Sequence, residues 1–433
     1  MTFLKRFHRR DLFRVSAAAA AAGAAFAESA EAQRPEAQGP DIAIPQAIRD
    51  LRPMTGGITP ISDDERRGRI ARAQELIREN RMDGIVIEPG TTMLYYTGVR
   101  WGTSERLFAF VIPASGEPAW ICPGFEENRA REVVRFSNDV RVWQEHENPC
   151  QFVVQFLKER GSRFNRIGVE QYARFFVFDN LRKASPATEY PIADPVTVGC
   201  RMIKSAHEIA IMQRANEITL AAFKAAYPFA KEGMTPRDFG ALIRAAHTAL
   251  GVSGSGGPSF GKATSNPHGS IAAQVLKEGD VILVDGGCDL EGYKSDITRS
   301  WVYGKPSEKQ VRIWNLERKA QDAALAAAKP GVPCEAVDYA ARKVLTDAGL
   351  GPDYKLPGLP HRTGHGIGMD GHEAINLVRG NKIPMRPGMC FSDEPMIVIP
   401  EEFGIRLEDC MHITEDGAKL FTPQAPSIEH PFG

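Results

Sequence analysis

From residue 62 to about residue 198, the hydrophobic pattern alternates between the spacing of amphipathic helices and the short apolar runs of strands. Ser62 and Glu65 form a capping-box pattern, which indicates the start of the first helix. The apolar runs that are typical of strands are 85–87, 107–112, 120–121 and 167–169. This order predicts a small α/β domain with a mixed sheet, which we place at residues 59–200.

After about residue 200, the predicted elements occur in groups instead of alternating. Helical spacing begins near Ala206 and again after Thr235, an N-cap that is followed by proline at the first helical position. Two further helices are predicted at residues 308–328 and 334–348. Strand-like runs lie between and after these helices, so we expect an α+β fold with an antiparallel sheet for residues 201–433.

The first 58 residues do not have the pattern of a folded core. A basic segment is followed by a mildly apolar, alanine-rich stretch, and the run 9–14 resembles a twin-arginine export signal. A general secretory signal or an uncleaved anchor is the rival interpretation, but the stretch is far shorter than the roughly 20 residues of a membrane span. We therefore expect a twin-arginine signal peptide at residues 1–32, a flexible leader at 33–58, and export to the periplasm.

Composition and charge narrow the class of function. The formal net charge is −1 over 433 residues, and no basic stripe indicates nucleic-acid binding. No segment has the length and hydrophobicity of a membrane span. The seven cysteines are scattered and include no C-x-x-C pair, so we expect buried free thiols rather than a disulfide framework.

Carboxylates recur where predicted strands end. Asp285 ends the apolar run 281–284, glycines follow it, and Asp296 begins the returning segment, so a hairpin would bring the two carboxylates together. Taken alone, both are equally well explained as turn and capping aspartates, because Asp beside Gly is common in turns. Glu394 and Glu408 lie in strand-like sequence, where a core-facing carboxylate is costly unless it is paired or bound to a metal.

Three histidines, His361, His365 and His372, fall within twelve residues and among glycines that make a helix improbable there. Chance clustering in a core is the alternative. The predicted metal ligands are Asp285, Asp296, His365, Glu394 and Glu408. Oxygen ligands with a single nitrogen suit Mn²⁺, Fe²⁺, Co²⁺ or Zn²⁺. Two such ions, roughly 3.5 Å apart, would share a bridging hydroxide at neutral pH.

The order of these ligands, with G-H-G-I-G at 364–368 and G-I-R-L-E-D at 404–409, resembles the pita-bread (M24) metallopeptidases. The R-x-I-K-S segment at 201–205 makes the chain similar to the creatinase/prolidase/aminopeptidase P branch of that family. The resemblance covers about residues 60–420. It implies a catalytic pita-bread domain, hydrolysis of peptides with proline at the second position, two metal ions with Mn²⁺ the most frequent, and a homodimer.

The resemblance also implies a role for each ligand. Asp285 and Asp296 would hold one ion, and His365 and Glu394 the other. Asp296 and Glu408 would reach both ions. Glu394 would act in addition as the general base.

Four further residues are assigned by the same resemblance. His268 and His372 would donate hydrogen bonds to the scissile carbonyl or to the oxyanion that develops from it. His361 would hold the proline side of the substrate. Arg406 would orient carboxylates through a bidentate pair, or be purely structural.

The sequence departs from the family pattern in two places. Residues 394–396 read E-P-M where E-P-G is usual, and residues 372–375 read H-E-A-I where H-E-x-P is usual. Neither change removes a ligand, but both reshape the pocket. Three functions therefore stay open: an Xaa-Pro dipeptidase or aminopeptidase, a metal-dependent lyase similar to the dimethylsulfoniopropionate lyases of this fold, and a non-catalytic binding protein. Retention of all five ligands favours the peptidase.

Overall fold

The computed structural model describes residues 42–433. The predicted signal peptide, residues 1–32, and the first part of the predicted leader lie outside the described residues. In the part that the structure describes, no helix is both long and apolar enough to cross a membrane.

The described end of the predicted leader is packed, in contrast to the flexible segment that we expected. It contains the short helix α2 (Gln46–Arg49), whose Ile48 side chain is fully buried. Further along, the backbone N–H of Met54 donates to the carbonyl of Leu250, and Arg214 donates to the carbonyl of Met54. The anchoring partners lie about 160 residues or more away in the chain, which is why local composition did not indicate them.

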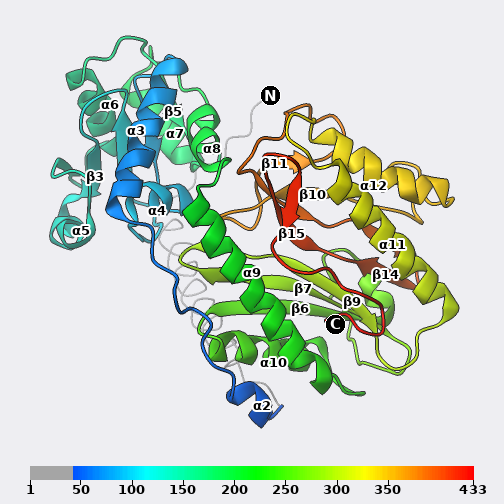
Figure 1. The fold of residues 1–433 in the computed structure, drawn as a ribbon. Coiled ribbons are helices and arrows are strands. Elements are labelled where there is room, and N and C mark those ends of the chain that lie inside the picture. The colour runs from blue at the N-terminus through cyan, green and yellow to red at the C-terminus, as the bar shows by residue number, and fades with distance from the viewer. Residues whose placement is uncertain (1–41) are drawn as a thin grey trace, which may run out of the picture. The chain divides into compact units, whose positions relative to one another are not determined.

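Residues 63–201 form a mixed sheet with helices, as predicted (Figure 1). The strand order is β4-β3-β2-β1-β5, in which β1 runs antiparallel to β2 and parallel to β5. Ser62 caps α3 through the predicted capping box with Glu65. The elements are α3 (Asp63–Glu79), β1 (Gly84–Ile87), α4 (Thr91–Thr97), β2 (Ala109–Pro113), β3 (Ala119–Pro123), η1 (Gly124–Glu126), α5 (Glu127–Val133), β4 (Val140–Trp143), α6 (Pro149–Glu159), β5 (Ile167–Val169), α7 (Phe175–Ala184) and α8 (Asp194–Arg201).

Residues 206–433 form the predicted α+β arrangement, in which the named strands pair antiparallel. Its helices are α9 (Ala206–Ala226), η2 (Tyr227–Phe229), α10 (Pro236–Ala249), η3 (Gly261–Ser265), α11 (Glu308–Ala327) and α12 (Glu335–Asp347). Its strands are β6 (Ser253–Phe260), β7 (Val281–Leu290), β8 (Tyr293–Lys294), β9 (Ile297–Val302), β10 (Gly364–Gly366), β11 (Glu373–Leu377), β12 (Cys390–Asp393), β13 (Met396–Ile399), β14 (Phe403–Arg406), β15 (Asp409–Ile413) and β16 (Ala418–Leu420).

Two sheets meet at the place where the predicted ligands gather. One contains β6, β7, β8 and β9, and the other has the order β11-β10-β12-β15-β16. Thr298 and Glu408 exchange two backbone hydrogen bonds of 3.3 and 3.1 Å, which join β9 to the segment before β15. Helices α9 and α10 pack on β6 and β7 (Figure 1). Helix α11 packs on β12 and on the paired strands β13 and β14, and α12 packs on β11.

Strand β7 corrects the predicted hairpin. We expected the strand to end at Asp285, but it continues to Leu290, and the turn is formed by Glu291 and Gly292 with φ of 52° and 88°. Glycines 286 and 287 are required by close packing instead of by a turn. A Cβ atom at Gly286 would lie 2.3 Å from the carbonyl oxygen of Ser255, too close for any other residue type.

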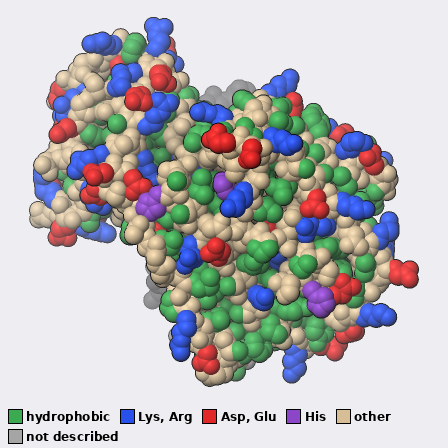
Figure 2. Space-filling view, in the orientation of Figure 1, with side chains coloured by type: hydrophobic (Ala, Val, Ile, Leu, Met, Phe, Trp, Pro, Cys, Tyr) green, Lys and Arg blue, Asp and Glu red, His purple; other side chains and the backbone are tan. Residues whose placement is uncertain are grey.

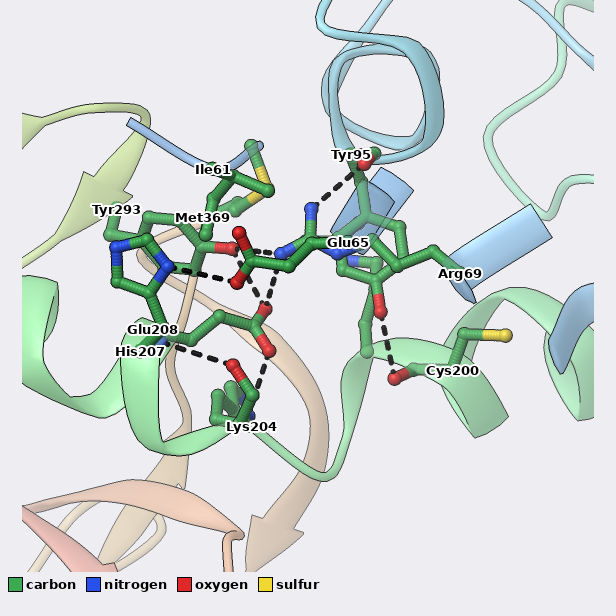
Figure 3. Close-up of polar contacts among 12 residues, drawn as sticks. Ile61, Glu65, Arg69, Tyr95, Cys200, Lys204, His207, Glu208, Tyr293 and Met369 are labelled. Atoms are coloured by element: carbon green, nitrogen blue, oxygen red, sulfur yellow. Dashed lines mark hydrogen bonds and ion pairs between the residues drawn. The ribbon is translucent and has the colours of Figure 1, made fainter. Parts of the chain in front are cut away.

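A buried ion-pair network links α3 to the carboxy-terminal part (Figure 3). Arg69 donates to the hydroxyl of Tyr293 at 2.8 Å and lies 3.1 Å from Glu208, and the same hydroxyl donates to Glu208 at 2.7 Å. The Arg69 guanidinium also stacks over the Tyr95 ring at 4.0 Å. Because Tyr293 lies on β8, three residues before Asp296, this network fixes the hairpin that carries a predicted ligand.

The surface and the cysteines agree with the sequence patterns. Figure 2 shows basic and acidic side chains interspersed over the visible face. All seven cysteines are buried and free, as predicted. Burial raises the pKa of several of these thiols, for example that of Cys150 to about 12, so they are poor nucleophiles.

Candidate metal centre

The five predicted ligands converge from five places in the carboxy-terminal part. Their positions are Asp285 within β7, Asp296 directly before β9, His365 in β10, Glu394 directly after β12 and Glu408 between β14 and β15. Potential donor atoms form groups in which all lie within 4.8 Å of one another. One group is Asp285, Asp296 and Glu408, and another is His365, Glu394 and Glu408. Glu408 thus belongs to both groups, as a residue that reaches two ions would.

His365 presents an unprotonated nitrogen to carboxylates. Its Nδ1–H donates to the carbonyl oxygen of Gly366 at 3.0 Å, because a carbonyl only accepts, and this leaves the lone pair on Nε2. Nε2 lies 3.2 Å from Oε1 of Glu394 and 3.8 Å from Oδ2 of Asp296. Burial, assisted by neighbouring His372, lowers the pKa of His365 to about 3, so the ring is neutral. The atoms that face one another here all carry lone pairs and no proton, so a bound cation would stabilise their close approach.

The carboxylates of the centre lie close together, and all but Asp285, whose side chain is 38% exposed, are largely buried. Burial and the nearby carboxylates of Asp285 and Glu394 raise the pKa of Asp296 well above its ordinary value. Burial also raises the pKa of Glu394 to about 7, and burial and Asp296 raise that of Glu408. Four carboxylates and one neutral imidazole fit two divalent cations, because positive charge there offsets the repulsion and the desolvation.

Arg406 is the basic side chain that contacts these carboxylates. It is 3 % exposed, pairs with Asp285, and lies 4.0 Å from Glu408. Its Nε donates to the hydroxyl of Thr298 at 3.0 Å, and that hydroxyl donates to Glu408 at 2.6 Å. Arg406 therefore contacts two of the predicted ligands, Asp285 directly and Glu408 through Thr298.

Ser392 was missed by the sequence analysis. Its hydroxyl accepts from the backbone N–H of His365 at 3.0 Å and donates to Oε1 of Glu394 at 3.2 Å. It thereby ties two predicted ligands together. Its position two residues before Glu394 could have identified it, because residues i and i+2 of an extended segment point to the same side.

A second layer of acids lies behind the ligands. Asp393 and Asp409 are fully buried, together with Glu317 of α11. Arg299 pairs with Asp409 at 2.7 Å and donates to the backbone carbonyl of Glu408 at 2.9 Å. Arg299 of this layer thereby fixes the main chain of Glu408. Neither Glu317 nor Arg299 was predicted, because their partners lie far away in the sequence.

Two of the three histidines expected to contact substrate, His268 and His372, line separate cavities. Exposed His268 lines a cavity of about 770 Å³ together with Asp285 and Arg406. His361 donates from Nδ1 to the carbonyl of Arg362 at 2.7 Å, and within residues 42–433 its buried Nε2 has no hydrogen-bond partner. Burial lowers the pKa of His361 to about 4, so Nε2 is a free acceptor.

The His372 ring lies against that of His365, with the centroids 4.0 Å apart and the planes tilted by 57°, and His372 lines a separate cavity. Its loop is held by the next residue, Glu373, which accepts from Arg201 at 2.5 Å and from Lys204 at 2.9 Å. His372 also joins Asp296 and His365 in a third group of possible metal donors, a role that the sequence analysis did not assign to it.

Comparison with known proteins decides the family. Residues 210–415 match the description "Metallopeptidase family M24", and residues 69–203 match "Creatinase/Prolidase N-terminal domain". An Xaa-Pro dipeptidase of Lactobacillus delbrueckii subsp. lactis is 32% identical over 368 residues, which cover 83% of this chain and 97% of the relative. The chain belongs to metallopeptidase family M24. Its fold is the predicted creatinase-like domain followed by a pita-bread domain.

Solved structures agree with this assignment. Dipeptidase PepE from Mycobacterium ulcerans superposes with a TM-score of 0.78 at 32% identity, covering 86% of this chain and 99% of that one. Prolidase from Thermococcus sibiricus gives 0.75 at 29% identity, covering 82% and 96%. This M24 protein is accordingly a metallopeptidase and hydrolase, and the alternative of a non-catalytic binding protein is not retained.

Proposed function

We propose that this metallopeptidase is an Xaa-Pro dipeptidase with a centre for two divalent ions. The observation that carries the proposal is Glu408, whose carboxylate belongs to two groups of donors, one with Asp285 and Asp296 and one with His365 and Glu394. The names of relatives, an Xaa-Pro dipeptidase and a prolidase among them, support the substrate class and favour the dipeptidase over an aminopeptidase.

The chemistry that the ions supply when bound is polarisation of the scissile carbonyl and a lowered pKa of water. Glu394 is the residue that we assign as general base, because its carboxylate lies between His365 and the hydroxyl of Ser392. His372 and His268 are assigned to the carbonyl oxygen and to the charge that develops on it. His361 is assigned to the proline side of the substrate, and among the described residues its buried Nε2 has no hydrogen-bond partner.

The metal that we propose is Mn²⁺, with Co²⁺, Zn²⁺ and Fe²⁺ as alternatives. The donor set is rich in oxygen and has one imidazole nitrogen, and it contains no thiolate.

We also propose that the protein forms a homodimer and is exported to the periplasm. A homodimer rests on the family resemblance alone. Export to the periplasm rests on the basic segment at residues 5–14 and the apolar stretch after it, which the described residues do not include. Replacing Arg9 and Arg10 by lysine should leave the unprocessed protein in the cytoplasm, as judged by fractionation.

The function is tested by Mn²⁺-dependent release of proline from Ala-Pro, run beside Ala-Pro-Ala as a tripeptide. The variants are Asp285→Asn and Glu394→Ala, with Glu415→Ala on an exposed turn as the matched control. Turnover of the dipeptide alone, lost in both site variants and kept in the control, supports the proposal. Turnover of the tripeptide would mean an aminopeptidase. Bound metal with neither product would overturn the proposal and direct the assay to small zwitterionic lyase substrates.

A further inference from the structure

A cavity of about 440 Å³ adjoins the metal centre at His372. Its walls come from α4, from the segment before α7, from α8 and from residues 370–374. Because His372 also belongs to a donor group with Asp296 and His365, a substrate held at the centre has room to extend into this cavity. The volume is ample for a long side chain.

Acidic side chains line this cavity, and most of them are neutralised. Glu88 pairs with Arg174 at 2.6 Å. Glu373 is paired with both Arg201 and Lys204, and Asp370 with Arg201 at 2.7 Å. These contacts account for three of the five carboxylates in the wall.

The two remaining carboxylates, Glu170 and Asp194, form no ion pair with any Lys, Arg or His that the structure describes. Burial raises the pKa of Glu170 to about 7, and the hydroxyl of Thr92, the backbone of Glu88 and the nearby charge of Arg201 lower it by less. Burial also raises the pKa of Asp194. A desolvated carboxylate that has no ion pair of its own favours a cation that reaches it.

The arrangement of the two cavities orients a dipeptide. Burial lowers the pKa of His361 most, and Arg406 and His268, which lower it further, both line the cavity of about 770 Å³. If His361 holds the proline side there, the residue before proline faces the other cavity, at His372.

We infer that the cavity beside His372 binds the side chain of the residue before proline and selects basic side chains, with Glu170 as the residue that determines specificity. This inference rests on the proposed Xaa-Pro dipeptidase activity. The preferred substrates of the enzyme would be the dipeptides Lys-Pro and Arg-Pro. The ammonium or guanidinium group would pair with Glu170, and Asp194 would add a second negative charge.

The test compares kcat/KM for Lys-Pro and norleucyl-Pro, which share an α-amine and differ in the side-chain charge. Wild-type enzyme should prefer Lys-Pro by about tenfold, the size expected of one partly buried ion pair. In Glu170→Gln the ratio should fall close to one. Glu132→Gln, an exposed carboxylate of α5 away from the cavity, is the matched control and should keep the preference. If Glu170→Gln does not fold, Asp194→Asn should still reduce the ratio.

Each other outcome has a distinct meaning. A wild-type ratio of one with normal turnover of Ala-Pro overturns the inference and leaves the proposed function intact. A Glu170→Gln enzyme that keeps the ratio overturns it as well. An equal loss on both substrates would assign Glu170 to the shared α-amine and would also contradict the inference. If no Xaa-Pro dipeptide is hydrolysed, the proposed function fails, and the inference falls with it.

Discussion

The Nε2 atom of His365 lies 3.2 Å from Oε1 of Glu394, and neither atom carries a proton to share when the imidazole is neutral and the carboxylate is ionised. Two acceptors at this distance repel unless a cation lies between them or a proton is taken up. Metal binding should therefore relieve the repulsion between His365 and Glu394, and removal of the metal should restore it.

Replacing His365 by alanine removes the single nitrogen donor of the centre. We expect the affinity for Mn²⁺ at one of the two positions to fall by at least about 100-fold, since loss of a mere supporting contact already costs 10- to 100-fold. Titration calorimetry of the metal-free protein measures this directly. His412→Ala, on β15 and outside the donor groups, is the control and should bind as wild type does. Unchanged stoichiometry and affinity in His365→Ala would remove it from the ligand set.

Ser392→Ala should lower the affinity for metal, although Ser392 is not a predicted ligand. The hydroxyl ties the main chain of His365 to the carboxylate of Glu394, so its loss frees both groups to rotate. We expect about a tenfold loss of Mn²⁺ affinity with the fold retained, as is usual for groups that orient ligands. Circular dichroism and calorimetry give the two measurements, and Ser137→Ala, far from the centre in the sequence, serves as control. An affinity equal to that of wild type would show that Glu394 is held by other contacts.

Arg69 and Arg72 lie on the same helix, α3, but in opposite environments. The Arg69 side chain is 9% exposed beside Glu208, whereas that of Arg72 is 49% exposed beside Glu75. Arg69→Ala leaves a buried carboxylate without its partner and should lower the free energy of unfolding by about 3 kcal/mol. Arg72→Ala should cost less than about 1 kcal/mol, because water already solvates that pair. Urea unfolding of both variants checks the difference, and equal losses would contradict a structural role for the network at Arg69.

Glu373 should make stability depend on acid pH. Burial opposes its ionisation, but Lys204 and Arg201 dominate and lower its pKa from 4.5 to about 2. A carboxyl whose folded pKa is depressed contributes stability above its unfolded pKa and loses it as the pH falls through the folded value. Its contribution, about 3 kcal/mol, should be complete above about pH 5 and disappear between about pH 4.5 and 2.

The matching measurement is the unfolding free energy of wild type minus that of Glu373→Gln, followed across this range. The difference should shrink steadily as the pH falls from about 4.5 to 2. A difference that stays constant with pH would mean that Glu373 acts through packing instead of through its charge.

The ligand set could be predicted because the chemistry and the spacing coincide. Asp285, Glu394 and Glu408 stand in strand-like sequence, where carboxylates are rare unless a cation needs them. His365 stands among glycines that rule out the common helical zinc pair. The family resemblance then implied a role for each residue, and all five side chains converge in the structure.

The predictions that failed depended on contacts between distant segments. Gly286 was interpreted as a turn residue, but it allows β6 to approach β7, and only the partner strand reveals that need. Ser392 and Glu317 carry no motif of their own, because their roles are defined by His365 and by strands of another sheet. The end of the predicted leader packs against α9 and α10 for the same reason.

The five predicted ligands span the chain from Asp285 to Glu408 and lie on or directly beside strands of two different sheets. An ion held among them would close chain loops in the way that a disulfide does, and all seven cysteines of this chain are free. The metal would then be a reversible cross-link between the sheets. A chelator could open it, and refilling the site could restore it, without any change in redox state.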